Sequence, residues 1–248
     1  MNVLRWRTRN LLLADAVLAV VLVALLVLIS QVGVAASPGA PEPGALLYLT
    51  TFDTFNDEWD LYAGRKAAQV VEGQLQIRID VSDDGAFSWL DRLFSDFDLT
   101  VEATQLGGPD DNGYGVIFRH RDEHHFYQFL ISGDGHYQLI RRNGPNALTD
   151  VTTLNVWRRS EHVRMGQDAT NVIRIVARGD TFRFYVNGQP LELCLGENAI
   201  PATCEGGIET DLLVDSTFAY GHIGVGARAF SDPGVVVGFD NMVVVGPE

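Results

Sequence analysis

The sequence predicts a nearly all-β protein, a two-sheet antiparallel jelly-roll sandwich preceded by one N-terminal transmembrane helix. From Ala45 onward, apolar residues recur with period two between clusters of turn residues, which is typical of strands. No long stretch of this part has the i, i+3, i+4 periodicity of an amphipathic helix. Residues 1–36 differ in kind, because there a long apolar run follows three arginines.

The apolar run from Leu11 to Ile29 is broken only by Asp15. Because about 20 helical residues cross the ~30 Å hydrocarbon layer of a bilayer, we expect a transmembrane helix over residues 11–34. The arginines of residues 1–10 should hold that tail in the cytoplasm. The helix is then the signal anchor of a single-pass protein of the cell membrane. The rest of the chain lies on the periplasmic or extracellular side.

A short linker follows the apolar run. Residues 35–45 include SPGAPEPG, which is rich in proline and glycine and too poor in apolar groups to fold. Residues 46–248 form the extracytoplasmic domain. An alternative to the anchor stays open here, because Val34-Ala35-Ala36 before Ser37 fits the small-residue pattern at which signal peptidase cleaves.

The predicted strands of the domain are bounded by turn residues. Phe97 to Ala103 alternates apolar and polar side chains, and Asn187-Gly188 is a strong signal for a two-residue hairpin turn. More than ten antiparallel strands in about 200 residues predict a sandwich. The other predicted strands are Gln74 to Ile79, Ala86 to Leu90, Tyr114 to Arg119, Phe126 to Ile131, Tyr137 to Arg141, Asn171 to Ala177, Thr181 to Val186, Gln189 to Leu193, His222 to Ala227 and Val235 to Val245.

The charge of the chain limits its partners. The formal net charge is −14, and residues 1–36 hold three arginines but only one acidic residue, so the domain itself is more acidic still. Such a domain repels the phosphates of nucleic acids and anionic lipid head groups. We therefore expect no nucleic-acid partner.

Cys194 and Cys204 are the only cysteines. Outside the cytoplasm the expectation for such a pair is a disulfide bond, which would stabilise the fold by roughly 2 to 3 kcal/mol in the chain-entropy model. A zinc site is the alternative. It would need two more ligands, and no histidine lies close in the sequence.

Residues 107–139, GGPDDNGYGVIFRHRDEHHFYQFLISGDGHYQL, predict three strands joined by two turns. Tyr127, Phe129 and Ile131 share the face that we expect in the core. A flat aromatic ring and planar polar groups on the other face would suit stacking on a sugar and paired bonds to its hydroxyls. The candidate ligand-binding residues on that face are Arg119, Phe126, Gln128, His136 and Gln138.

The first turn of this stretch collects titratable side chains, namely His120, Asp122, Glu123 and His124. We expect them to be solvated, with metal binding or catalysis as the alternative. Calcium is the one cofactor that the sequence suggests, because Asp and Asn oxygens in loops are typical calcium ligands. The candidate ligands are Asp110, Asp111 and Asn112 in one loop and Asp240 with Asn241 in another, and a hydrogen-bonded turn is the alternative role for both sets.

From Phe52 to Val245 the chain resembles a family of exported domains. The resemblance rests on the stretch above together with QDATNVIRIVARGDTFRFYVNGQPL, GHIGVGARAF and FDNMVVV. The sequence is similar to concanavalin A-like and laminin G-like sandwiches, near the domains of bacterial proteins that are described as similar to family 16 glycoside hydrolases and to 3-keto-disaccharide hydrolases. The resemblance implies the fold, whereas its members include enzymes, sugar-binding modules and domains without a known role.

The sequence contains no complete catalytic motif. A retaining glycosidase needs two carboxylates about 5 to 5.5 Å apart, and family 16 enzymes place Glu, Asp and Glu at alternate positions of one strand. In IETDLLVD the spacing of Glu209 and Asp211 fits, but the third position is Leu213. No GxSxG or HExxH motif occurs either. We therefore expect a domain that is not an enzyme.

The sequence favours a noncatalytic, membrane-anchored interaction domain, an accessory subunit whose helix packs against other subunits of a membrane complex. Trp157-Arg158-Arg159 offers an aromatic and cationic patch of the kind found at interfaces, although Trp157 fits the core equally well. The alternative is a carbohydrate-binding module, or a glycoside-acting hydrolase, of concanavalin A-like fold, with glycans as partners.

Overall fold

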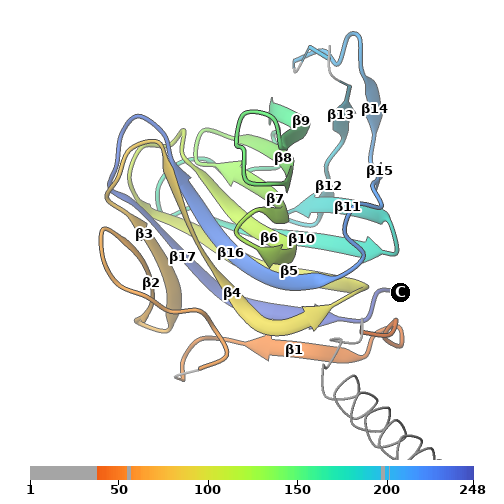
Figure 1. The fold of residues 1–248 in the computed structure, drawn as a ribbon. Helices are drawn as coiled ribbons and strands as arrows, with labels where there is room; N and C mark the ends of the chain where they lie inside the picture. Colours follow the sequence, from red (N-terminus) through yellow and green to blue (C-terminus); the bar gives the residue numbers. More distant parts are fainter. Residues whose placement is uncertain (1–37, 55–56, 197–198, 201) are drawn as a thin grey trace, which may run out of the picture. The chain divides into compact units, whose positions relative to one another are not determined.

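Two antiparallel sheets face each other across one hydrophobic core (Figure 1). The computed structural model describes residues 38–248 except residues 55–56, 197–198 and 201. The predicted transmembrane helix, residues 11–34, lies outside the described part. Among the described residues, none forms a helix long and apolar enough to cross a membrane.

The larger sheet has nine strands, with β17 in its interior. Along its main path the order is β12 (Gln189–Pro190), β11 (Thr181–Val186), β10 (Thr170–Arg178), β5 (Phe97–Gly107), β17 (Val235–Val245), β3 (Gln74–Ile79) and β2 (Lys66–Val71). Off this path, β1 (Leu46–Thr50) pairs with β17, and β15 (Leu213–Val214) pairs with β11. The β11–β12 pair confirms the hairpin predicted around Asn187-Gly188, and β10 pairs with β11 on its other side.

The smaller sheet has six strands. Their order is β4 (Asp84–Phe94), β16 (Gly221–Ala229), β6 (Gly113–Asp122), β7 (His125–Ser132), β8 (His136–Asn143) and β9 (Val151–Arg159). Strands β6, β7 and β8 are the three predicted consecutive strands. They form a meander, and β9 adds a fourth strand that the sequence did not predict.

Aromatic side chains from both sheets meet in the core. Phe118 on β6 lies 5.4 Å from Phe182 on β11, measured between ring centroids, and Phe129 on β7 stacks on Phe184 at 5.0 Å. Each of these four residues is essentially fully buried. Because they alternate with outward-facing residues along their strands, each strand also presents a second face to solvent. The outer face of the six-stranded sheet carries the candidate site.

Two local predictions are confirmed. Asn187 and Gly188 both have positive φ angles, 52° and 79°, as a two-residue type I′ turn between β11 and β12 requires. Cys194 and Cys204 form a disulfide bond with a Cα–Cα distance of 5.5 Å. This bond closes a small hairpin, β13 (Leu193–Leu195) with β14 (Ile208–Thr210), which extends away from the two main sheets (Figure 1).

Candidate functional site

A cavity of about 770 Å³ lies on the outer face of the six-stranded sheet. Aromatic rings line it, Phe87 and Trp89 from β4, Phe126 from β7 and Tyr62, and we call it the aromatic cavity. Phe87 and Trp89 alternate on β4 with Ala86, Ser88 and Leu90, which are buried. The same period of two that fills the core therefore places these rings on the outside.

Strands β16 and β6 separate the rings of β4 from Phe126 on β7, and two outward positions of β16 have no side chain. These positions are Gly224 and Gly226, which lie between β4 and β6, whereas Arg228 of the same strand lines the cavity. A Cβ atom on Gly226 would lie 2.8 Å from the Cβ of Phe87, so any side chain there would displace that ring. The glycines thus leave the aromatic surfaces accessible from above the sheet.

Polar groups form one wall of the aromatic cavity. The Lys66 ammonium lies 3.0 Å from an oxygen of Asp84, and the Tyr62 hydroxyl donates to the carbonyl of Phe87 at 3.1 Å. Burial raises the pKa of Asp60 above its ordinary value. Burial also acts to raise the pKa of Asp84, but the hydrogen bonds from Lys66 and from the Gly85 amide outweigh it and leave the pKa lowered. The wall therefore holds two carboxyl groups whose pKa values are shifted in opposite directions, upward for Asp60 and downward for Asp84.

His120 is buried beside the aromatic cavity instead of lying in a solvated turn as predicted. Its side chain is 3% exposed, and its ring stacks on Trp89 with a centroid distance of 4.9 Å. Neither ring nitrogen has a hydrogen-bond partner among the described residues. Burial, helped by the nearby His222, lowers the pKa of His120 to about 4. The imidazole is thus neutral at ordinary pH.

Arg119 does not belong to the outer face, and that prediction is wrong. The pairing of β6 with β7 is irregular between Phe118 and Asp122, and Arg119 has a positive φ of 52°. This bulge turns the Arg119 side chain inward, where it is fully buried over the ring of Phe182. Its guanidinium donates to the carbonyl of Gly179 at 3.2 Å and lies 3.6 Å from Asp96. Burial lowers the pKa of Arg119 to about 10.

The other four predicted ligand-binding residues share the outer face, but they do not form one cluster. Strands β7 and β8 pair in regular register from His125 to Tyr137, so Phe126, Gln128, His136 and Gln138 all point outward. Phe126 and Gln128 line the aromatic cavity. His136 lines a second cavity together with Asp111, and its Nδ1 lies 2.9 Å from Asp134. Gln138 lines neither cavity.

The predicted calcium ligands are mostly engaged in the hydrogen bonds of turns. The Asn112 amide donates to the Pro109 carbonyl, and its oxygen accepts from the Phe230 amide. The Asp110 carbonyl accepts from Asp134. Asp240 accepts from the backbone of Asn241, at a bulge of β17 where Asn241 has a φ of 49°. Within the described residues, no group of three or more His, Cys, Asp or Glu side chains could hold a metal, and calcium binding stays a prediction.

The incomplete carboxylate triplet lies outside the aromatic cavity. Glu209, on β14, forms an ion pair with Arg158, and Asp211 lies 3.4 Å from Arg183. Leu213 is buried on β15. Both carboxylates thus have arginine partners next to the disulfide hairpin.

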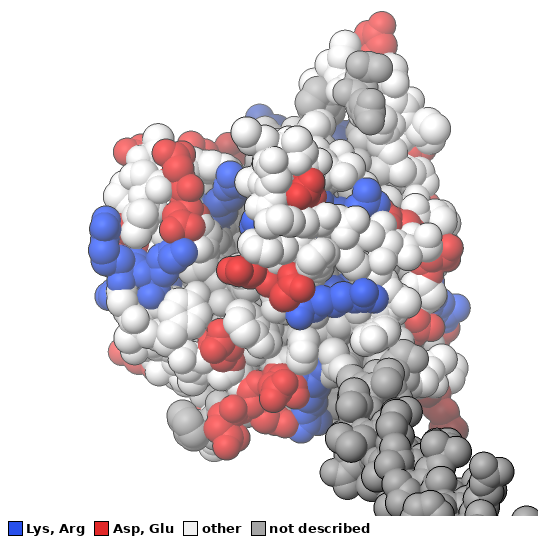
Figure 2. Space-filling model, viewed as in Figure 1, with Lys and Arg blue, Asp and Glu red and all other residues white. Residues whose placement is uncertain are grey.

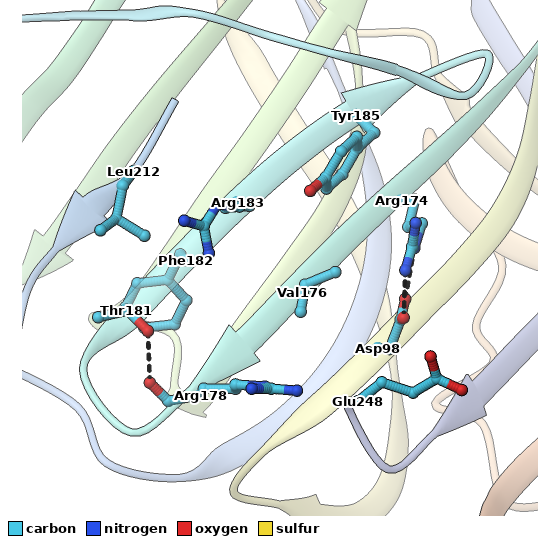
Figure 3. A pocket seen from close by; sticks show the side chains of 10 residues that line it. All are labelled: Asp98, Arg174, Val176, Arg178, Thr181, Phe182, Arg183, Tyr185, Leu212 and Glu248. Atoms are coloured by element: carbon cyan, nitrogen blue, oxygen red, sulfur yellow. Dashed lines mark hydrogen bonds and ion pairs between the residues drawn. The ribbon is translucent and has the colours of Figure 1, made fainter. Parts of the chain in front are cut away.

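A smaller cavity of about 200 Å³ lies on the outer face of the nine-stranded sheet, around Val176 (Figure 3). Asp98 accepts two hydrogen bonds from Arg174, at 2.8 and 2.6 Å. The guanidinium of Arg174 also lies over the ring of Tyr185, 5.1 Å from its centroid. The Tyr185 ring is thus covered by Arg174, and two of the three arginines that line this cavity are paired with carboxylates. This cavity therefore has fewer groups free to contact a ligand than the aromatic cavity has.

Charges of both signs are interspersed over one face of the domain (Figure 2). Figure 2 shows Asp and Glu side chains scattered over the viewed face among smaller groups of Lys and Arg, with no continuous basic patch on that face. A ligand without a large charge is compatible with such a surface.

Sequence reasoning missed the two aromatic rings of β4 and the carboxyl groups of the wall. The sequence did contain a signal for the two rings, because the strand Ala86 to Leu90 was predicted. In that strand Phe87 and Trp89 alternate with Ala86 and Leu90, so the two rings had to share the other face. Asp60 had no such signal. It lies outside the strands, and an isolated bridge between Trp59 and Leu90, with a hydrogen bond from the Ser88 hydroxyl to the Asp60 carbonyl, joins its segment to β4.

Comparisons with known proteins point to one family and one fold. The family model described as "3-keto-alpha-glucoside-1,2-lyase-like domain" matches residues 50–195. No curated protein matches the chain significantly.

Several solved structures share the fold at low sequence identity. The carbohydrate binding module CBM66 from Bacillus subtilis has a TM-score of 0.52 at 17% identity, over 76% of this chain and 95% of that one. A protein of unknown function with a galectin-like fold from Bacillus subtilis has a TM-score of 0.55 at 12% identity, over 83% and 97%. The GH43 protein BlXynB from Bacillus licheniformis has a TM-score of 0.54 at 11% identity, over 80% of this chain but only 39% of that one.

Proposed function

Because the chain belongs to the 3-keto-α-glucoside-1,2-lyase-like domain family, we propose that it binds carbohydrate in the aromatic cavity of the six-stranded sheet. The observation that carries the proposal is the arrangement of Phe87, Trp89 and Phe126 around a cavity that also has planar polar groups. Sugar rings stack on aromatic faces through their C–H surfaces, while their hydroxyl groups need hydrogen-bond partners beside the ring. The cavity supplies both.

The polar partners for hydroxyl groups come from two sides. Gln128 rises from β7 and makes no hydrogen bond of its own side-chain amide within the described residues. Asp60 and the Lys66–Asp84 pair lie in the wall formed before and within β4. Carboxylates and amides bond sugar hydroxyls without needing a charged ligand. This composition therefore favours a neutral sugar.

The alternative interpretation of the sequence has become the better supported one. The family description and the fold shared with CBM66 and with GH43 BlXynB both make a carbohydrate the first ligand class to test. The accessory subunit of a membrane complex, which the sequence alone favoured, gains no support from these comparisons. We therefore propose glycans as the partners of this domain.

Catalysis on the bound glycoside is the second candidate function. The observation that favours it is the pair Asp60 and Asp84, whose pKa values are shifted in opposite directions in one cavity. Such pairs can divide the roles of proton donor and ionised group. In that case Asp60 would give its proton to the oxygen that leaves the sugar, and ionised Asp84 would take a proton from the water that attacks the anomeric carbon. Turnover of any glycoside that is abolished in Asp60→Asn would replace the noncatalytic proposal by this one.

Glycan binding is tested with the full-length protein on an array of oligosaccharides. The protein is purified in a polyoxyethylene detergent, since detergents with sugar head groups would compete. We expect binding that weakens at least about tenfold in Trp89→Ala or Phe126→Ala, the change that ~1.4 kcal/mol of lost contact produces. Tyr185→Ala removes an aromatic ring from the outer face of the other sheet and is the matched control. Binding that survives both cavity variants, or no binding at all, would contradict the proposal.

A further inference from the structure

A second cavity lies on the same outer face of the six-stranded sheet. It has a volume of about 340 Å³, and we call it the Trp157 cavity after its largest side chain. Its lining residues are Asp111, Ser132, Asp134, His136, Trp157 and Phe230. It shares no residue with the aromatic cavity.

The two cavities are placed along the same pair of strands. On β7, Gln128 lines the aromatic cavity and Ser132 lines the Trp157 cavity; on β8 the corresponding residues are Ile140 and His136. Each pair is four residues apart in strands whose mutual register is regular. At a rise of about 3.3 Å per residue, the two cavities are therefore roughly 13 Å apart along the sheet.

A continuous strip of side chains connects them. Arg228 lines the aromatic cavity, and its guanidinium lies 5.4 Å from the centroid of the Phe230 ring, which lines the Trp157 cavity. The Phe230 ring in turn meets Trp157 edge to face at 6.1 Å. The surface between the two cavities is therefore formed by side chains that contact one another, from Arg228 through Phe230 to Trp157.

Trp157 lies at the end of this path that belongs to the second cavity. It comes from the edge strand β9, yet its ring reaches β6, where a Cβ on Gly113 would lie 3.1 Å from the ring and 2.8 Å from the Leu130 side chain. Leu130 is the outward residue between Gln128 and Ser132 on β7. A chain-like ligand that occupied both cavities would therefore reach the partly exposed Trp157 ring at one of its ends.

The chemistry of the Trp157 cavity resembles that of the first. An aromatic ring stands beside carboxylates: Asp111 is exposed, and one oxygen of Asp134 is bonded to Ser132 and His136, which leaves the second oxygen for a ligand. We propose that the two cavities are the ends of one binding path, so that the ligand is an oligosaccharide longer than a disaccharide. This inference rests on the proposed function and adds the length of the glycan to it.

The test is a length series on the same array, with α- and β-linked glucose, xylose, galactose and mannose oligosaccharides of two to six units. We expect the affinity for the recognised sugar to rise at least about tenfold between the disaccharide and the hexasaccharide. Trp157→Ala should remove this gain and leave disaccharide binding unchanged. Asp111→Asn, at an exposed position, should lower the affinity for the hexasaccharide in the same selective way if Trp157→Ala fails to fold.

The outcomes separate the two proposals. Equal affinity for the disaccharide and the hexasaccharide, with both lost in Trp89→Ala, would overturn the extended path and keep the sugar site. The same conclusion follows if Trp157→Ala and Asp111→Asn bind the hexasaccharide as the unchanged protein does. Absence of binding to every glycan would overturn the proposed function, and the extended path with it.

Discussion

His120 is a buried imidazole that has no hydrogen-bond partner among the described residues, a costly arrangement for a polar group. What surrounds it is mostly aromatic: Trp89 stacks on the ring, and Phe87 and Phe126 lie 5.6 and 6.1 Å away. These are the same rings that line the aromatic cavity. The neutral imidazole therefore packs against the rings of Trp89, Phe87 and Phe126 and helps to hold them in position.

The burial of His120 predicts a dependence of stability on pH. Its pKa is about 4 in the folded protein and about 6.5 in an unfolded chain, so the unfolded state takes up the proton first as the pH falls. The contribution of the neutral imidazole to stability is thus complete above pH 6.5 and is lost between about pH 6.5 and 4. From this shift, the full loss is on the order of 3 kcal/mol.

Urea unfolding at pH 7, 5 and 4 measures this effect. In His120→Phe, whose ring cannot take up a proton, the stability should fall less toward pH 4 than in the unchanged protein. His162→Phe, at a half-buried position remote in sequence, is the matched control and should keep the original pH profile. Parallel profiles for the unchanged protein and His120→Phe would show that His120 is not the group responsible.

Arg119 and His120 show where prediction from the sequence fails, because both were expected at the surface and both are buried. Strict alternation along GYGVIFRH places Arg119 outside, next to Phe126, and the structure has it inside. The cause is one bulge, in which Arg119 takes a left-handed conformation. Glycine and asparagine are the residues that usually indicate this conformation, and the sequence has neither at this position. By contrast, Phe126 and Gln128 were placed correctly because β7 is regular over its whole length.

At the scale of the element, the strands with clear alternation were predictable and the irregular ones were not. Strands β5, β10 and β11 follow period two closely. Strand β9, VTTLNVWRR, was missed because its pairing with β8 shifts register twice and its side chains do not alternate in burial. For that reason the sequence did not decide whether Trp157 lies in the core or at the surface. Its position over β6 follows only from the structure.

The disulfide hairpin of β13 and β14 carries a prediction of its own. The double variant Cys194→Ser/Cys204→Ser should lose roughly 2 to 3 kcal/mol of unfolding free energy, because the bond no longer restricts the unfolded chain. Glycan binding should persist, since none of the hairpin residues lines the aromatic cavity. Denaturant titration of the unchanged protein with and without a reductant provides the control.

Two findings would contradict this role of the hairpin. Equal stability of the double variant and the oxidised protein would mean that the bond does not constrain the chain. Loss of glycan binding in a folded double variant would mean that the hairpin takes part in the site.

For the whole molecule, composition and motif order were enough to predict the fold and the family, and the structure and the family model confirm both. A sandwich is specified by many strands at once, so one missed bulge or one missed strand leaves the architecture unchanged. The function was not predictable to the same extent. The aromatic cavity combines Phe87 and Trp89 with Phe126, which is far from them in sequence, and only the pairing of β16 between β4 and β6 brings them together.

The arrangement of the chain in the membrane stays a prediction from residues 1–36. A positively charged tail followed by a long apolar run favours a cytoplasmic N-terminus and an exported domain. Protease added to intact cells should therefore remove residues 46–248. Permeabilised cells are the control for access, and protection in intact cells alone would show the opposite orientation. A purified protein that begins at Ser37 would show that the segment is cleaved and that no anchor remains.

The interior position of β17 has a consequence for how the protein is made. This strand, Val235–Val245, bonds to β5 on one side and to β3 and β1 on the other, so it joins partners that were synthesised long before it. Pairing between segments so distant in sequence makes folding slow. A nascent chain cannot complete the larger sheet before β17 has left the ribosome. Until then it presents unpaired strand edges, which require protection from aggregation.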